Sequence, residues 1–213
     1  MIIRHVILDW SGTLVDDLLP VVKTTNHVLE SCGLPAITLA EFRAEFCLPI
    51  RKFYRQRLPH VPQAQLEQIF LTEYPKHHTE ITVLPHTLDF LRFCQERELG
   101  VYIASTVDAH TYETQMARFG IARFITKPYI GIADKTAKIH QILDENHLDR
   151  DETMFVGDME HDIEAGKAGG IHTCAVLTGY NLVGKLRAME PDLICQDLSE
   201  LQQFLAAQEV VRG

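Results

Sequence analysis

The stretch VILDWSGTLVDD, residues 6–17, joins a short apolar run to a polar turn. The apolar run, residues 6–8, is typical of a strand that is buried on both faces of a parallel sheet. Asp9 ends this run, and the Trp-Ser-Gly-Thr sequence that follows it favours a turn. The stretch therefore predicts a buried strand whose carboxyl end carries a carboxylate.

Similar apolar runs recur along the chain and alternate with amphipathic segments of helical periodicity. This alternation is typical of an α/β fold, in which helices cover both faces of a doubly wound, Rossmann-like parallel sheet. The sequence predicts further strands at 100–105, 123–130, 153–158, 172–178 and 192–197. It predicts helices at 85–98, 108–118, 134–147, 161–168, 181–189 and 198–208.

One long segment, residues 16–82, interrupts this alternation because it contains no convincing strand. Prolines near its internal junctions mark helix boundaries. We therefore expect a helical cap, residues 16–82, inserted after the first strand of a core that comprises residues 1–15 and 83–213. Within the cap, the periodicity predicts helices at 16–32, 38–46, 50–58 and 63–78.

The composition is that of a globular protein and argues against several kinds of partner. The 213 residues, 46% of them hydrophobic, suffice for one sizeable core and an inserted subdomain. A net charge of -9 argues against nucleic acid and anionic membranes as partners. The five scattered cysteines indicate reduced thiols, and we find neither a signal peptide nor an apolar run of membrane length. We expect a cytoplasmic protein, and no feature of the sequence predicts its oligomeric state.

Three of the predicted strands end in a small polar or acidic residue: Asp9, Ser105 and Asp158. Ligands of open α/β sheets bind at the carboxyl ends of the strands, although turns also favour Asp and Ser for local reasons. Asp162 follows Asp158 by four residues in GDMEHD, where the helix dipole would also favour an acid. Three clustered carboxylates need a cation, and hard oxygen ligands of this number suit Mg²⁺.

Lys135 opens a predicted helix in IADKTAKI, which is a mildly unfavourable place for a cation. A phosphate beside the carboxylates would need positive charge, and a lysine can supply it. The alternative is a solvated surface lysine. Lys127 competes for the same role, but it lies at the end of a predicted edge strand and precedes Pro128.

The order D-x-x-G-T, Ser105, Lys135 and G-D-x-x-x-D resembles the haloacid-dehalogenase-like superfamily of phosphohydrolases over essentially the whole chain. The segments DWSGTLVDD, FCLPIRKFY and VGDMEHDIEAG are most similar to a phosphoglycolate-phosphatase-like group. The resemblance implies a Mg²⁺-dependent phosphatase that acts on a small phosphorylated substrate, a phosphate monoester, through an aspartyl-phosphate intermediate.

The resemblance also implies roles for individual residues around the substrate. Asp9 would be the nucleophile that accepts the phosphoryl group. Ser105, with Thr106 beside it, would bind a phosphate oxygen. Lys135 would neutralise charge on the nucleophile and on the transferring phosphate.

The same resemblance implies a metal site. Asp9 and Asp158 would bind Mg²⁺ through their carboxylates, and Ser11 would bind it through its backbone carbonyl. Asp162 would complete the site directly or through water.

Ser11 departs from the family pattern, in which phosphatases usually carry a second aspartate that protonates the leaving group and then activates water. A serine hydroxyl cannot supply a proton as a carboxylic acid does, and such help is typically worth about 10²–10⁴-fold in rate. One interpretation is a phosphatase in which bound water or His161 does the proton work. If an acid is simply missing, Ser11→Asp should raise the turnover of alkyl phosphates.

Two other interpretations of Ser11 remain open. Phosphonoacetaldehyde hydrolases carry a similar D-W-A-G-T motif and cleave a carbon–phosphorus bond with a cap lysine, for which Lys52 is the candidate. A non-catalytic protein that retained the metal and phosphate site is the third.

Four basic residues of the predicted cap, Arg51, Lys52, Arg55 and Arg57, lie within seven positions of an otherwise acidic chain. On a helix, residues three and four apart are neighbours, so these side chains form a patch. Arg51 and Lys52 are our candidates for binding a second anionic group of the substrate. A solvated helix face is the alternative.

Overall fold

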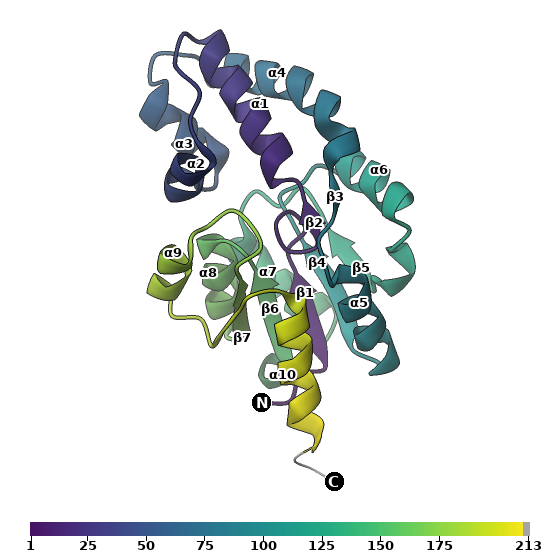
Figure 1. The fold of residues 1–213 in the computed structure, drawn as a ribbon. Helices are drawn as coiled ribbons and strands as arrows, with labels where there is room; N and C mark the ends of the chain where they lie inside the picture. Colours follow the sequence, from purple (N-terminus) through teal and green to yellow (C-terminus); the bar gives the residue numbers. More distant parts are fainter. Residues whose placement is uncertain (211–213) are drawn as a thin grey trace.

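A six-stranded parallel sheet forms the centre of the computed structural model, which describes residues 1–210 (Figure 1). The strand order is β5-β4-β1-β6-β7-β8, so β1 lies in the middle. Leu8 of β1 pairs with Ile103 of β4 and with Val156 of β6, which brings the carboxyl ends of three strands to one edge. The α/β, Rossmann-like fold prediction is confirmed. The strands are β1 (His5–Leu8), β4 (Gly100–Ala104), β5 (Lys127–Tyr129), β6 (Thr153–Gly157), β7 (His172–Val176) and β8 (Leu193–Cys195).

Helices cover both faces of the sheet because alternate residues of β1 point to opposite faces (Figure 1). Val6 and Leu8 pack with apolar residues of α5 (Thr87–Glu96), α6 (Ala109–Phe119) and α10 (Leu198–Val210). Ile7 packs with apolar residues of α7 (Lys135–Glu145) and α8 (Glu160–Gly169). The remaining helical elements of the core are α9 (Val183–Ala188) and two short 3-10 turns, η2 (Ala122–Phe124) and η3 (Arg150–Glu152).

Helices with an apolar core of their own fill the segment between β1 and α5. The buried aromatic rings of Phe42, Phe53 and Tyr54 lie in this core, and Met159 and Tyr180 of the sheet domain pack against it. The elements are α1 (Leu18–Ser31), α2 (Leu39–Glu45), α3 (Ile50–Arg57), α4 (Gln63–Glu73) and the 3-10 helix η1 (Tyr74–Glu80).

Two details of this segment differ from the sequence prediction. The helix predicted at 63–78 ends as an α-helix at Glu73 and continues as η1, because Pro75 cannot donate a backbone hydrogen bond. The segment was also expected to contain no strand, but β2 (Val15–Asp16) pairs antiparallel with β3 (Thr82–Val83) at its two ends. Strands of two residues are too short to produce a period-2 pattern.

Polar contacts hold the helical segment against the sheet domain on two sides. On one side, the guanidinium group of Arg118 on α6 donates to the backbone carbonyls of His78, Thr79 and Ile81. On the other, Asn181 Nδ2 and Lys185 Nζ both donate to the carbonyl of Phe46, at 3.4 and 3.2 Å. The helices therefore lie closed over the carboxyl edge of the sheet (Figure 1).

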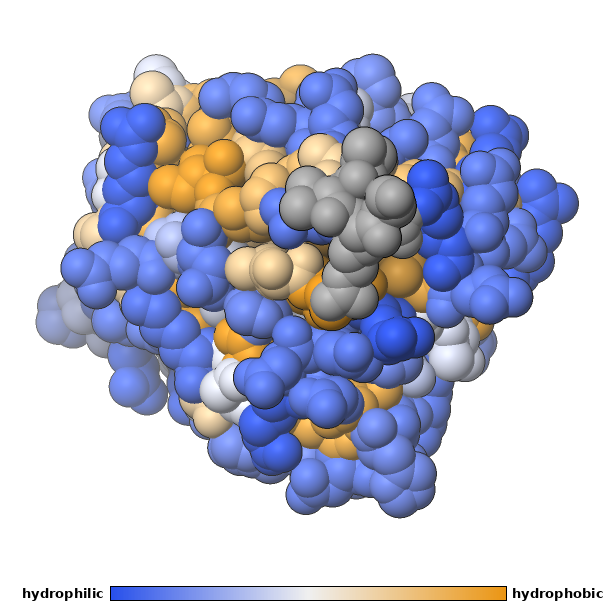
Figure 2. All heavy atoms as spheres, turned by 90° about the horizontal axis from the view of Figure 1, so that it is seen from below, coloured by the Kyte–Doolittle hydropathy of each residue, from blue (hydrophilic) through white to orange (hydrophobic). Residues whose placement is uncertain are grey.

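The face opposite these helices carries exposed apolar side chains. Figure 2 shows this underside, where apolar side chains gather near the chain termini. Met1 and Ile2 are 40% and 37% exposed, and a cavity of about 250 Å³ beside them is lined by Phe93 and Leu205. Within residues 1–210, none of the helices combines the length and the apolar character needed to cross a bilayer.

Candidate active site

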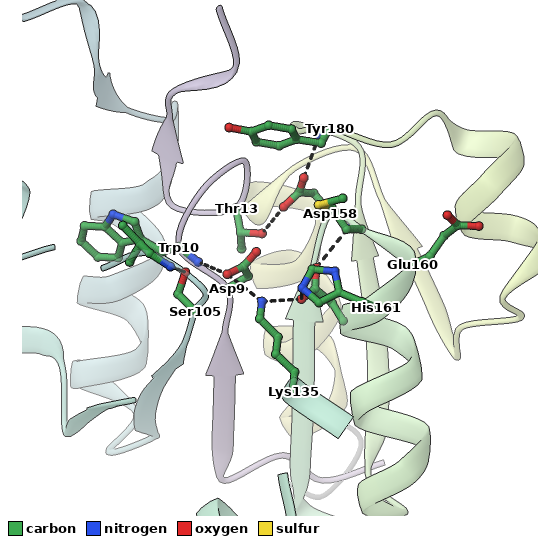
Figure 3. Close-up of polar contacts among 12 residues, drawn as sticks. Asp9, Trp10, Thr13, Ser105, Lys135, Asp158, Glu160, His161 and Tyr180 are labelled. Atoms are coloured by element: carbon green, nitrogen blue, oxygen red, sulfur yellow. Dashed lines mark hydrogen bonds and ion pairs between the residues drawn. The ribbon is translucent and has the colours of Figure 1, made fainter. Parts of the chain in front are cut away.

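Four charged side chains meet at the carboxyl edge of the sheet (Figure 3). Asp9 and Asp158 follow β1 and β6, whereas Lys135 and Asp162 come from the first turns of α7 and α8. Each of the four is at most 5% exposed. The sequence predicted all four, and the fold brings them together because β1 and β6 are neighbours.

Lys135 bridges two of the carboxylates. Its ammonium nitrogen lies 2.8 Å from Asp9 Oδ1 and 2.7 Å from Asp162 Oδ1. Burial opposes the charge of this lysine, but the two carboxylates outweigh it and raise its pKa. The surface-lysine alternative is therefore wrong. Lys127, the competing candidate, has a side chain that is 45% exposed and pairs with Glu145 at 3.2 Å.

Asp9 is oriented by its own turn. Its Oδ1 accepts a hydrogen bond of 2.7 Å from the backbone N–H of Trp10. Trp10 is fully buried. Its ring packs edge to face with that of Tyr112, with the ring centroids 4.8 Å apart, and its Nε1 donates to Gln115 Oε1 at 2.5 Å. Trp10 is therefore a packed anchor for the turn that carries Asp9.

Asp158 is held by two loops. Thr13 Oγ1 donates to its Oδ1 at 3.0 Å, and the backbone N–H of Tyr180 donates to its Oδ2 at 2.7 Å (Figure 3). Two glycines make this approach possible: a Cβ on Gly12 or Gly179 would lie 2.5 or 2.0 Å from Asp158 Oδ2. Burial, and then the charges of the neighbouring aspartates, raise the pKa of Asp158 well above its ordinary value.

Ser105 lies at the end of β4, beside the strand that carries Asp9. It is 1% exposed, and its Oγ accepts from the backbone N–H of Val107 at 3.3 Å. The hydroxyl proton remains available to donate toward an anion at the sheet edge. Thr106, its predicted companion, is exposed.

Ser11 donates its hydroxyl hydrogen to Asp17 Oδ2 at 2.6 Å, and Tyr180 donates its own to Asp17 Oδ1 at 2.8 Å. Asp17 is 3% exposed, and burial raises its pKa from 3.8 to about 6. Sequence reasoning missed Asp17 and Tyr180: Asp17 ends the DWSGTLVDD segment at a position to which the resemblance assigns no role, and Tyr180 belongs to no recognised motif. The one available signal was the adjacency of Asp17 to the DWSGT turn.

His161 faces the Asp9–Lys135–Asp162 bridge (Figure 3). Its Nε2 lies 3.5 Å from Asp162 Oδ1, yet neither ring nitrogen has a hydrogen-bond partner. Burial and then the Lys135 ammonium lower its pKa to about 3, so the imidazole is neutral. A neutral imidazole can exchange hydrogen bonds with a substrate or with water, but it is not the imidazolium acid that the sequence allowed.

The structure does not join the basic residues of α3 to the buried cluster. Arg51, Lys52 and Arg55 are exposed on α3, and Arg57 pairs with Glu45 at 2.5 Å. Within residues 1–210 the structure gives these four side chains no hydrogen bond or ion pair with the site residues. Their predicted contact with substrate stays a prediction.

The donor set fits a divalent cation. The carboxylates of Asp9, Asp158 and Asp162 are buried together with one ammonium group, which leaves two negative charges uncompensated. Carboxylate oxygens are the ligands that Mg²⁺ prefers. Asp9, His161 and Asp162 each offer a ligand atom, all within 4.8 Å of one another.

The chain is similar to known hydrolases over almost its whole length. A family model described as a haloacid dehalogenase-like hydrolase matches residues 6–176. The pyrophosphatase PpaX of Oceanobacillus iheyensis is 26% identical over 216 residues, covering 94% of this chain and 96% of that protein. A phosphoglycolate phosphatase of Synechococcus elongatus is also 26% identical, over 203 residues, covering 94% of this chain and 96% of that protein.

Solved structures share the fold. A haloacid dehalogenase-like hydrolase from Streptococcus pneumoniae superposes with a TM-score of 0.83 at 22% identity, covering 95% of this chain and 98% of that one. A protein from Clostridium acetobutylicum, described as a predicted phosphatase, superposes with a TM-score of 0.85 at 14% identity, covering 97% and 100%. These likenesses establish the architecture.

Proposed function

This chain belongs to the haloacid dehalogenase-like hydrolase family, as its motifs predicted, and we propose that it is a Mg²⁺-dependent phosphatase of a small phosphate monoester. The observation that carries the proposal is the buried bridge from Asp9 through Lys135 to Asp162, beside Asp158. A phosphoglycolate-like ester is the substrate class that the relatives named above suggest.

We assign the phosphoryl-transfer roles as follows. Asp9 attacks the phosphorus atom through its free carboxylate oxygen, while Lys135 and the N–H of Trp10 hold the other oxygen. As this bond forms, the bond from phosphorus to the ester oxygen breaks, and the alcohol leaves with a proton from bound water. Water then hydrolyses the aspartyl-phosphate, which returns Asp9 and releases inorganic phosphate. Ser105 donates to a phosphoryl oxygen, and Lys135 stabilises the charge that develops during transfer.

We assign the metal ligands to the Asp9 and Asp158 carboxylates and to the Ser11 carbonyl, with Asp162 bound directly or through water. When bound, Mg²⁺ supplies positive charge to the transferring phosphoryl group. Asp162 also has a second task that its contacts support: it orients Lys135 at 2.7 Å and accepts the N–H of Met159 at 3.0 Å.

No specific observation favours the alternative functions. A lysine that forms an imine needs burial or a close cation to become nucleophilic, whereas Lys52 is exposed on α3. The relatives named above are enzymes, which supports a catalytic role for this site over a binding role alone.

We also propose that residues 16–82 act as a cap that must open to admit substrate. Asp9, Lys135 and Asp158 are buried beneath these helices, so substrate cannot reach them in this arrangement. The free cysteines support a reducing, cytoplasmic environment.

A screen of phosphorus compounds tests the proposed function. The purified protein is incubated with Mg²⁺ and a panel of small phosphate esters, pyrophosphate, an aryl phosphate and phosphonoacetaldehyde, and inorganic phosphate is measured. We expect release from at least one ester, loss of release in EDTA, and none from Asp9→Asn. Release that persists in Asp9→Asn, or release from phosphonoacetaldehyde alone, would refute the proposal.

A further inference from the structure

Asp17 connects the active-site turn to the helical segment above it. It is the last residue before α1, and both of its carboxylate oxygens accept hydrogen bonds from hydroxyl groups. One comes from Ser11 at 2.6 Å and the other from Tyr180 at 2.8 Å. Asp17 is 3% exposed; its bond from Tyr180 is buried, and its bond from Ser11 is partly buried.

The bond to Asp17 decides what Ser11 can do. A hydroxyl group has one hydrogen, and that of Ser11 is already donated to a carboxylate. A charge-assisted bond of this length fixes the side-chain rotamer, and with it the turn whose carbonyl we assign to the metal. The Ser11 oxygen keeps lone pairs with which it can accept a hydrogen bond in the site.

An aspartate at position 11 would meet Asp17 directly. The Ser11 oxygen lies at hydrogen-bond distance from Asp17 Oδ2, so a carboxylate there would place a second negative group against the buried Asp17. Such contacts are strongly unfavourable. The pair of positions therefore accommodates one carboxylate and one hydroxyl.

Tyr180 extends this connection to the cap and to the metal site. Its ring packs against Phe42 and Phe46 of the cap, with centroids 6.1 and 5.3 Å apart. Its backbone N–H holds Asp158 at 2.7 Å, and its hydroxyl holds Asp17. One residue thus links the cap, Asp158 and Asp17.

We propose that Ser11 and Asp17 form a matched pair, in which Asp17 is a positioning residue that acts through the Ser11 hydroxyl and carries the carboxylate absent from position 11. The proposal rests on the phosphatase function assigned above. If an acid were simply missing, Ser11→Asp would raise turnover. The matched pair predicts instead that Ser11→Asp alone lowers turnover and thermal stability, and that exchanging the two residues restores much of both.

The kinetic test uses Asp17→Asn, Ser11→Ala, their double variant, Ser11→Asp, and the exchange variant Ser11→Asp with Asp17→Ser. Asp17→Asn should lower kcat about 10-fold or more with little change in KM, since positioning errors act on the reacting geometry. In the Ser11→Ala background, Asp17→Asn should have almost no further effect on kcat.

The exchange variant should turn over about 10-fold faster than Ser11→Asp. Asp16→Asn, an exposed neighbour in β2, is the matched control and should behave as the native protein.

A stability measurement separates this proposal from the phosphatase assignment. In EDTA, Ser11→Asp should lower the thermal midpoint by about 4 °C or more, and the exchange variant should recover most of the loss. Additive effects in the kinetic cycle, or an exchange variant that is no more stable than Ser11→Asp, would overturn the matched pair. If no ester is turned over at all, the phosphatase assignment fails while the midpoints still decide this proposal.

Discussion

Lys135 is the residue on which the electrostatics of the site depend. Its ammonium group is the one buried side-chain cation among the described residues, and it faces Asp9 and Asp162 at 2.8 and 2.7 Å. Removing one partner of a buried ion pair leaves an uncompensated charge, which typically costs about 3–5 kcal/mol. The lysine therefore stabilises the fold as well as the proposed reaction.

Lys135→Met should lower the free energy of unfolding by about 3 kcal/mol in EDTA and abolish turnover. Urea unfolding measures the first effect and phosphate release the second. Lys127→Met is the control, because that side chain is 45% exposed and should change stability by less than about 1 kcal/mol. Equal stability of the two variants would contradict the buried bridge.

Asp17 makes stability depend on pH in an unusual direction. Burial raises its pKa from 3.8 in the unfolded chain to about 6 in the folded protein, so the folded state binds the proton more tightly. The stability from this proton is fully present below pH 4 and is lost as the pH rises through about 6. An asparagine at this position cannot titrate.

The native protein should therefore lose stability relative to Asp17→Asn between pH 4 and pH 7, by an amount on the order of 3 kcal/mol. Urea unfolding of both proteins in EDTA, at several pH values, measures this difference. A difference that is constant with pH would show that the folded pKa of Asp17 is ordinary. Asp16→Asn serves again as the control.

The residues that sequence reasoning found differ in kind from those it missed. Asp9, Lys135, Asp158 and Asp162 were predicted because each stands at a recognisable strand end or helix start. The contact of Asp17 with Tyr180 joins positions 163 residues apart and depends on how the linker to α1 turns back toward the sheet. No local pattern encodes such a contact.

At the level of elements, two loops form a close-fitting cradle around Asp158. Residues 12–13 approach it from the turn after β1, and residues 179–180 approach it from the loop after β7. Gly179 leaves no room for a side chain, because a Cβ there would lie 2.0 Å from Asp158 Oδ2. The orientation of the Asp158 carboxylate thus depends on a glycine at position 179.

Gly179→Ala should displace the Asp158 carboxylate and raise the Mg²⁺ concentration for half-saturation about 10-fold or more. A Mg²⁺ titration followed by the fluorescence of Trp10, the single tryptophan of the chain, measures this without requiring turnover. Gly184→Ala on α9 is the control, since a Cβ there has nothing within 4 Å. If the Mg²⁺ concentration for half-saturation is unchanged in Gly179→Ala, Asp158 is not a ligand of the metal.

The elements themselves were largely predictable, and the exceptions have physical causes. Apolar runs of four or five residues, such as those of β1, β4 and β6, produce a clear signal for buried parallel strands. The β2–β3 pair and the 3-10 helix η1 were missed, because two-residue strands show no alternation and η1 continues directly from α4.

For the molecule as a whole, the helices of residues 16–82 and the buried site beneath them belong together. The apolar core of these helices contacts the sheet domain through Met159 and Tyr180, and polar contacts from Arg118 and Asn181 hold it on either side. Burial of Asp9, Lys135, Asp158 and Asp162 strengthens the charge interactions at the sheet edge. The central claim is that this enclosed edge transfers a phosphoryl group to Asp9.

Rapid-quench mass spectrometry on the native protein tests that claim most directly. The protein is mixed with Mg²⁺ and an ester that it turns over, quenched in acid within a single turnover, and digested. We predict a transient phosphoryl group on the peptide that contains Asp9, absent from Asp9→Asn. Release of phosphate within that turnover without a phosphorylated Asp9 peptide, or with the phosphoryl group on another residue, would contradict the account.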